Sequence, residues 1–218
     1  MKPIFPKWTN KIPLIIGIIV PIKLVGVIFF VWHYFSPKYT DVGYRPRQPI
    51  PYSHKLHAGD LGMDCRYCHS SIEKTGYADI PTTDTCMGCH KLILKDSPRL
   101  APLREAYASD KPIEWVKVHM LPDYARFNHS VHLSAGVGCT TCHGNVNQMD
   151  IVHQDQPLSM GWCLECHANP TPHLRPRNEI TNMNYDPTTS QYNPLTDPTR
   201  MRQPSPPSTD SGCGGCHY

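Results

Sequence analysis

All ten cysteines of the chain fall into one five-residue pattern, Cys-x-x-Cys-His, which occurs five times. The cysteine pairs and their histidines are Cys65, Cys68 and His69; Cys86, Cys89 and His90; Cys139, Cys142 and His143; Cys163, Cys166 and His167; and Cys213, Cys216 and His217. Two thiols three positions apart can each bond one vinyl-derived carbon of a haem, and the adjacent histidine then lies beneath the iron. The pattern therefore predicts five covalently bound c-type haems with these histidines as proximal iron ligands.

Zinc sites built from Cys-x-x-Cys pairs and short disulfides are the alternatives to haem. Neither requires a histidine in the fifth position. The chain has 13 histidines in 218 residues, so a histidine after all five pairs has a chance probability on the order of one in a million. No motif ends in lysine instead of histidine, so nothing in the pattern marks an open catalytic haem.

The first four motifs form two blocks of similar layout, each opened by an aromatic-x-His-x-x-His segment. Block one (residues 52–90) opens with YSHKLH and block two (residues 127–167) with FNHSVH. This layout resembles the small multihaem cytochromes of the c7 and c3 type, whose paired histidines supply distal ligands to different haems. The resemblance implies that role for four residues, His54, His57, His129 and His132.

Histidines outside the motifs support this interpretation, because a histidine near a haem motif in a chain with few apolar residues favours iron ligation. His119 is a further candidate, as are His153 and His173, and a surface role is the alternative for all three. For the fifth haem, a methionine thioether is a possible sixth ligand that raises the reduction potential. Met183 is preferred over Met120, Met149 and Met160 because it lies in the extension that leads to the last motif; packing is the alternative.

Residues 12–35 are nearly all apolar and long enough to cross a bilayer as one helix. Three lysines precede this stretch and two aromatic residues close it, which indicates a cytoplasmic N-terminus, although basic residues beyond the span weaken the orientation. A cleaved signal peptide is the alternative, but the run exceeds a usual h-region and no small-x-small cleavage site follows it. Because haem is attached on the exported side, we expect a single-pass anchor in the inner membrane and a periplasmic haem region.

Lys23 and Pro21 lie near the middle of this span, where a lysine is costly unless it faces protein or water. Two interpretations stay open. Lys23 snorkels to the interface while Pro21 kinks the helix, or both residues pack against the helices of a partner.

Composition indicates how the exported region is built. Hydrophobic residues make up only 39% of the chain and prolines number 23, which argues against long helices or a large sheet. We expect a multihaem cytochrome c fold, mostly loops and short helices wrapped on five haems in c7/c3-like repeats, after one transmembrane helix. The formal charge of +3 falls by roughly one for each haem with ionised propionates, so nucleic acid is excluded as a partner.

Three regions are predicted: an anchor at 1–37, a tetrahaem region with two dihaem blocks at 38–168, and a proline-rich extension with the fifth haem at 169–218. Between the blocks, Ser97 is expected to cap a helix that Pro98 begins, with Leu100, Leu103 and Tyr107 on one face. The extension has no helical or strand periodicity. We expect it to lie along a partner or along the haem core, with a flexible tether as the alternative.

Three stretches carry a more specific resemblance: HAGDLGMDCRYCHSSIEKTGYADIPTTDTCMGCH, EWVKVHMLPDYARFNHSVH and PLSMGWCLECHANP. They resemble the pentahaem subunit of bacterial alternative complex III over most of residues 50–185, whereas the tail after Met183 is less distinctive. The resemblance implies an anchored periplasmic pentahaem domain. It also implies an iron–sulfur subunit, NrfD-like quinol-oxidising membrane subunits and a monohaem cytochrome as partners.

The function implied is electron relay: a partner oxidises quinol, and the haems carry electrons towards a soluble carrier or a terminal oxidase. Two other classes stay open. A self-sufficient quinol dehydrogenase of the NapC or NrfH type would purify as a stable single subunit. A nitrite-type multihaem reductase would need a haem with an open sixth position and would show a high-spin signal.

Overall fold

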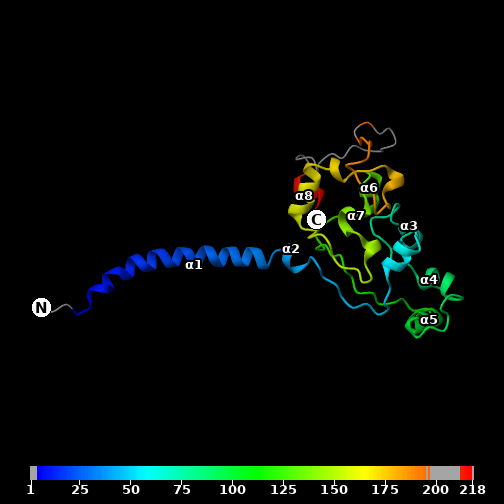
Figure 1. The fold of residues 1–218 in the computed structure, drawn as a ribbon, viewed down its shortest axis with the longest axis horizontal. Coiled ribbons are helices and arrows are strands. Elements are labelled where there is room, and N and C mark those ends of the chain that lie inside the picture. Colours follow the sequence, from blue (N-terminus) through cyan, green and yellow to red (C-terminus); the bar gives the residue numbers. More distant parts are fainter. Residues whose placement is uncertain (1–3, 195, 197–211, 218) are drawn as a thin grey trace. The chain divides into compact units, whose positions relative to one another are not determined.

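The computed structural model describes residues 4–194, 196 and 212–217. The chain divides into two compact units, Met1–Asp41 and Val42–Tyr218. In the first, the turn η1 (Lys7–Lys11) leads into α1 (Ile12–Tyr34), and the short helix α2 (Pro37–Thr40) follows (Figure 1). Within the described residues, Lys7–Tyr34 is long and apolar enough to cross a membrane, with a mean hydropathy of 2.8. The predicted N-terminal apolar helix is confirmed, with Pro21 inside it.

The second unit consists of short helices joined by loops (Figure 1). In chain order its helices and helical turns are η2 (Lys55–Asp60), α3 (Cys65–Cys68), α4 (Thr83–His90), η3 (Pro98–Leu100), α5 (Ala101–Ala108), α6 (His129–Ser134), α7 (Cys139–His143), η4 (Val146–Gln148), α8 (Met160–Ala168), η5 (Thr171–His173), η6 (Arg177–Glu179) and η7 (Gly212–Gly215). The part of the chain that the structure describes contains no strand, and its only bridges are Ala125 with His217 and Val137 with Leu174. The expectation of helices and loops is confirmed.

Every motif lies on or directly beside a helical turn. The side chains of Asp64 and Ser159 begin two of these turns by accepting hydrogen bonds from the backbone N–H groups of Arg66 and Trp162. On a helix, residues three and four positions apart share one face. The turn therefore brings both thiols and the histidine of a motif to the same side.

The apolar core of the second unit is small. Its buried hydrophobic side chains, among the described residues, are Ile50, Met87, Leu103, Leu133, Met149, Leu174 and Ile180. Seven such side chains bury too little apolar surface to stabilise a region of this length by themselves. The porphyrin faces of the haems that the motifs predict would supply the apolar surface that this core lacks.

The spacer between the blocks packs against the first of them. Leu103 of α5 is buried, and Leu100 and Tyr107 pack on the same cluster, as predicted. The capping role predicted for Ser97 is wrong, because its side chain makes no cap hydrogen bond. The chain enters through a 3-10 turn in which the Leu100 N–H donates to the Ser97 carbonyl, and α5 begins only at Ala101.

Candidate functional site

In block one, Tyr52 packs against both histidines that follow it. Its ring stacks on His57 with centroids 4.5 Å apart and meets His54 edge-on at 4.8 Å. His57 Nδ1 lies 2.9 Å from the Ser53 carbonyl oxygen, so Nδ1 donates to the backbone and Nε2 stays available. The centroid of the His57 ring is 6.3 Å from that of His90, the histidine of the second motif.

Block two repeats this arrangement with other residues. Phe127 lies 4.5 Å from His132 and 4.7 Å from His129 between ring centroids. His132 Nδ1 lies 2.8 Å from the Asn128 carbonyl oxygen. The His132 ring faces His167 of the fourth motif with centroids 6.0 Å apart. The repeat recognised in the sequence is therefore also a repeat of ring geometry.

These ring separations fit a haem iron. With metal–nitrogen bonds of about 2 Å, two imidazoles that ligate one iron from opposite faces have centroids about 6 Å apart. The pairs His57–His90 and His132–His167 lie at 6.3 and 6.0 Å. In three of these rings, those of His57, His90 and His132, Nδ1 is also within 3.0 Å of a backbone carbonyl oxygen, as is usual for a metal-ligating histidine.

The first histidine of block two lies on a loop of block one. The backbone N–H of His129 donates to the Gly76 carbonyl at 3.1 Å, and His129 Nδ1 lies 3.1 Å from the same oxygen. The Ser130 N–H donates to the Thr75 carbonyl beside it. This loop follows the first motif, whose His69 Nδ1 lies 2.6 Å from a carbonyl oxygen further along the same loop. His129 and His69 are thus held by one segment.

The opening segment of block one makes the reciprocal contact. The Lys55 N–H donates to the Met149 carbonyl at 3.0 Å, and the Ser53 hydroxyl donates to Asp150 at 2.8 Å. Met149 and Asp150 follow the third motif in the chain. The segment that carries His54 therefore contacts the loop that follows the third motif. Each block's opening segment thus contacts the loop after the first motif of the other block, an arrangement that we call the exchange of opening segments.

Burial favours the neutral form of five of the imidazoles in this region. It is the main cause that lowers the pKa of five rings, those of His54 (to about 4), His119, His129, His132 and His143 (to about 3). A neutral imidazole keeps one unprotonated nitrogen, which a metal ion requires. The site is therefore chemically prepared to hold iron at neutral pH.

His119 contacts the third motif directly. Its ring lies 4.3 Å from that of His143, and His119 Nε2 is 3.3 Å from His143 Nδ1. This separation is shorter than the distance that fits an iron between two rings. The contact is that of a hydrogen-bond partner of His143, and iron ligation by His119 stays a prediction.

The fifth motif lies beside the segment that precedes block two. The Arg126 N–H donates to the Cys216 carbonyl at 2.8 Å, and the Tyr124 ring lies 5.6 Å from that of His217. Sequence reasoning missed Tyr124, because no local pattern marks a contact with a motif so distant in the chain. Met183 lines a cavity of about 360 Å³ together with Cys65 of the first motif. Its assignment to the fifth haem stays a prediction.

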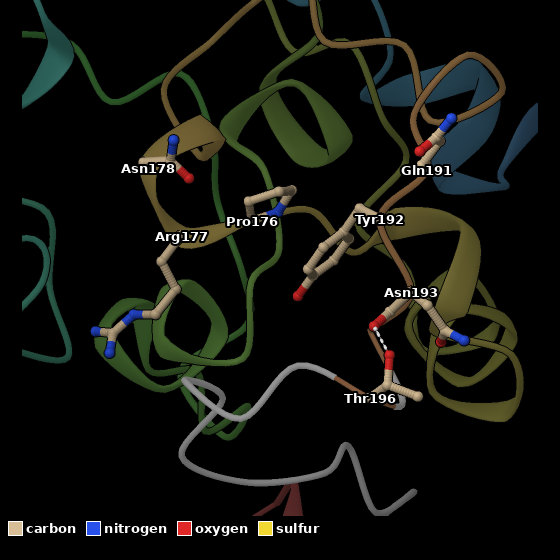
Figure 2. Close-up of a pocket in the computed structure, with 7 residues that line it drawn as sticks. All are labelled: Pro176, Arg177, Asn178, Gln191, Tyr192, Asn193 and Thr196. Atoms are coloured by element: carbon tan, nitrogen blue, oxygen red, sulfur yellow. Dashed lines mark hydrogen bonds between the residues drawn. The ribbon is translucent and has the colours of Figure 1, made fainter.

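A larger open cavity, of about 740 Å³, lies in the extension (Figure 2). Its lining residues are Pro176, Arg177, Asn178, Gln191, Tyr192, Asn193 and Thr196. Figure 2 shows the Tyr192 side chain pointing into it. No cysteine or histidine of a motif lines this cavity, so it is separate from the candidate haem sites.

Comparison with known proteins supports the multihaem interpretation. No protein-family model matches the chain. The chain is 29% identical over 180 residues to a Nitratidesulfovibrio vulgaris protein described as "Menaquinone reductase, multiheme cytochrome c subunit"; the match covers 72% of this chain and 80% of that protein. The similarity supports a multihaem cytochrome c that transfers electrons in a quinone oxidoreductase, a broader class than alternative complex III.

Proposed function

We propose that the chain is the pentahaem electron-transfer subunit of a membrane quinone oxidoreductase. One observation carries the proposal. In each block, the ring of a histidine outside the motifs lies as far from the ring of a motif histidine (centroids 6.3 and 6.0 Å apart) as two imidazoles that ligate the same iron. Each motif would hold one haem through its two cysteines and its histidine. When bound, the haem supplies a one-electron iron couple.

The same contacts support a proposal for the histidines that would hold iron. His57 and His90 would hold one iron, and His132 and His167 another. The contacts between the blocks favour His129 with His69 and His54 with His143 for the remaining pairs. The role of these residues is to orient neutral nitrogens towards iron and to exclude water around it, and both functions need the buried environment described above.

The finer assignment is the alternative complex III type, anchored by α1 with the haem unit in the periplasm. An NrfD-like partner would oxidise quinol, an iron–sulfur subunit and a monohaem cytochrome would complete the complex, and the electrons would leave to a periplasmic acceptor. The description of the relative as a menaquinone reductase favours a second candidate, in which the electrons flow towards menaquinone.

Haem content tests the core of the proposal. The full chain, produced in a host that attaches c-type haem and purified in mild detergent, should carry five haems per chain by its haemochrome spectrum and its mass. All bis-histidine haems should be low-spin in electron paramagnetic resonance. Fewer than five haems, or a high-spin haem that binds nitrite, would contradict the relay.

The direction of electron flow needs the complex isolated from native membranes. If the complex oxidises quinol, a menaquinol analogue should reduce the haems, and an inhibitor of the quinone site should block this reduction. If it reduces menaquinone, dithionite-reduced haems should be reoxidised by a menaquinone analogue faster than they can be reduced by the quinol. Recovery of the chain without integral-membrane partners would contradict both versions.

A further inference from the structure

Arg175 is a buried cation beside the third motif. The residue is only 6% exposed. Nη2 donates to the Thr140 hydroxyl at 2.8 Å, Nη1 donates to the Asn182 carbonyl at 2.9 Å, and the guanidinium lies over the Tyr185 ring at 4.8 Å. Thr140 is the residue after Cys139 in the motif, so the charge is held directly against the haem-binding turn.

Among the described residues, no carboxylate forms an ion pair with Arg175, and its Nε has no hydrogen-bond partner in the protein. Glu179 acts on it only through space, because the Glu179 oxygens accept from Asn178 and Asn182. An unpaired buried charge is costly to folding, and an arginine stays protonated at any physiological pH. Stability alone does not explain this position.

Two glycines make room for Arg175. At Gly138, which directly precedes the motif, a Cβ atom would overlap the Arg175 guanidinium. The backbone of Gly138 is ordinary, with φ −78° and ψ 149°, so glycine is needed there for space and not for conformation. At Gly136 a Cβ would lie 2.7 Å from the Arg175 carbonyl oxygen.

Charged groups also lie beside the first motif, where they pair with one another. Asp64 directly precedes the first motif and pairs with Arg66 at 2.8 Å, and Arg66 in turn lies 3.6 Å from Glu73. These two carboxylates and one guanidinium leave a local charge of −1 beside the first motif. At the third motif the Asp155 carboxylate lies against Gly144, and Glu179 acts on Arg175 through space.

We propose that Arg175 raises the reduction potential of the haem bound to Cys139 and Cys142. A fixed positive charge in a low-dielectric site disfavours the ferric state, which carries one more positive charge than the ferrous state. The inference rests on the proposed function, because it requires that the third motif binds haem.

Spectroelectrochemical titration of the haem-loaded full chain tests the proposal. Arg175→Gln should lower one of the five potentials by about 59 mV or more, corresponding to about tenfold in a one-electron equilibrium. Arg175→Lys, which keeps the charge, should restore most of that shift. Gly138→Ala should shift the same couple in the same direction by less, because it displaces the flexible guanidinium without removing it. Asp64→Asn should raise a different couple.

Haem content, measured first, separates the two proposals. A chain without haem at the first and third motifs contradicts the proposed function. A fully loaded chain whose potentials do not respond to Arg175→Gln or to Gly138→Ala overturns the inference and leaves the proposed function standing. Equal shifts in Arg175→Lys and Arg175→Gln would show a structural role and also overturn it. If Arg175→Gln does not accumulate, Gly138→Ala and Arg175→Lys decide the question.

Discussion

At the scale of single residues, the site depends on which nitrogen of each imidazole is engaged. Backbone carbonyl oxygens lie within hydrogen-bond distance of Nδ1 in His57, His69, His90, His129 and His132. Donation from Nδ1 fixes the tautomer and leaves Nε2 as the free acceptor. The same backbone contacts that fold the chain therefore also prepare the ligands.

Removing a distal imidazole should change one haem only. We expect His57→Ala to convert one haem of five to the high-spin state, because its iron loses its sixth ligand while the two thioethers and His90 remain. Electron paramagnetic resonance and the haemochrome ratio check this expectation. His33→Ala, in the membrane helix, is the matched control and should leave all haems low-spin. An unchanged spectrum in His57→Ala would contradict the assigned pair.

Asp64 should make stability depend on pH. The side-chain hydrogen bond from Arg66 is the main cause that holds the pKa of Asp64 well below its usual range. The pairing therefore stabilises the fold at neutral pH, and this stabilisation is lost as the pH falls below about 4 towards the lowered pKa. Because both side chains are about 40% exposed (43% and 38%), Asp64→Asn should cost under about 1 kcal/mol at pH 7.

Denaturant unfolding at several pH values measures this effect. The difference in free energy of unfolding between the native chain and Asp64→Asn should shrink as the pH falls from 5 towards 2. Asp96→Asn is a matched control, since Asp96 is exposed, forms no ion pair among the described residues and precedes no motif. A constant difference across the acid range would contradict the role of the ion pair.

At the scale of elements, the exchange of opening segments joins the two blocks into one structure. The segment with His129 bonds the loop at Thr75 and Gly76, and the segment at Ser53 and Lys55 bonds the loop at 149–150. In the proposed ligand assignment, neither block completes its own first haem site. The blocks therefore should not fold or load haem independently.

This exchange predicts crossed effects of substitution. His54→Ala should raise amide hydrogen exchange in residues 139–150 of block two, because the ligand that orders that haem site is lost. His129→Ala should instead raise exchange in residues 65–79 of block one. Mass-spectrometric hydrogen exchange on the loaded chain distinguishes the two patterns. Effects confined to the block that carries the substitution would contradict the crossed assignment.

At the scale of the whole molecule, the helical N-terminal unit and the haem unit are separate compact bodies. All described hydrophobic side chains of α1 are unburied within the unit itself. A lipid environment or partner helices suit such a surface, whereas water does not. The membrane role of α1 and the electron-transfer role of the second unit can thus be tested apart.

Replacement of residues 1–41 by a cleavable export signal, which delivers the rest of the chain to the compartment where haem is attached, should release a folded haem protein. We expect residues 42–218 to carry the same number of haems as the full chain, to show the same absorption spectrum and to stay in the soluble fraction. Membrane fractionation and haem content measure both expectations. Lys23→Leu in the full chain is the control and should remain in the membrane. Loss of haem in the replacement variant would show that the two units depend on each other.

The cysteine motifs, the histidine pairs and the apolar N-terminal helix could be recognised in the sequence, because each is a local pattern with a fixed spacing. Local spacing places two thiols and a ring on one side of a helical turn. It also explains why Nδ1 of His57 and of His132 can donate a hydrogen bond to the backbone carbonyl oxygen four positions earlier. These patterns and the high proline content were enough to predict that the helices are short.

Only the tertiary structure decided which groups meet across the chain. The pairing of His57 with His90, the exchange between blocks, the contact of Tyr124 with His217 and the burial of Arg175 all join residues that are distant in sequence. The sequence alone does not distinguish Arg175 from a surface arginine, because only the packing of the folded chain excludes water from its side chain. Spacing thus determined what each motif can bind, and long-range packing determined the surroundings that tune it.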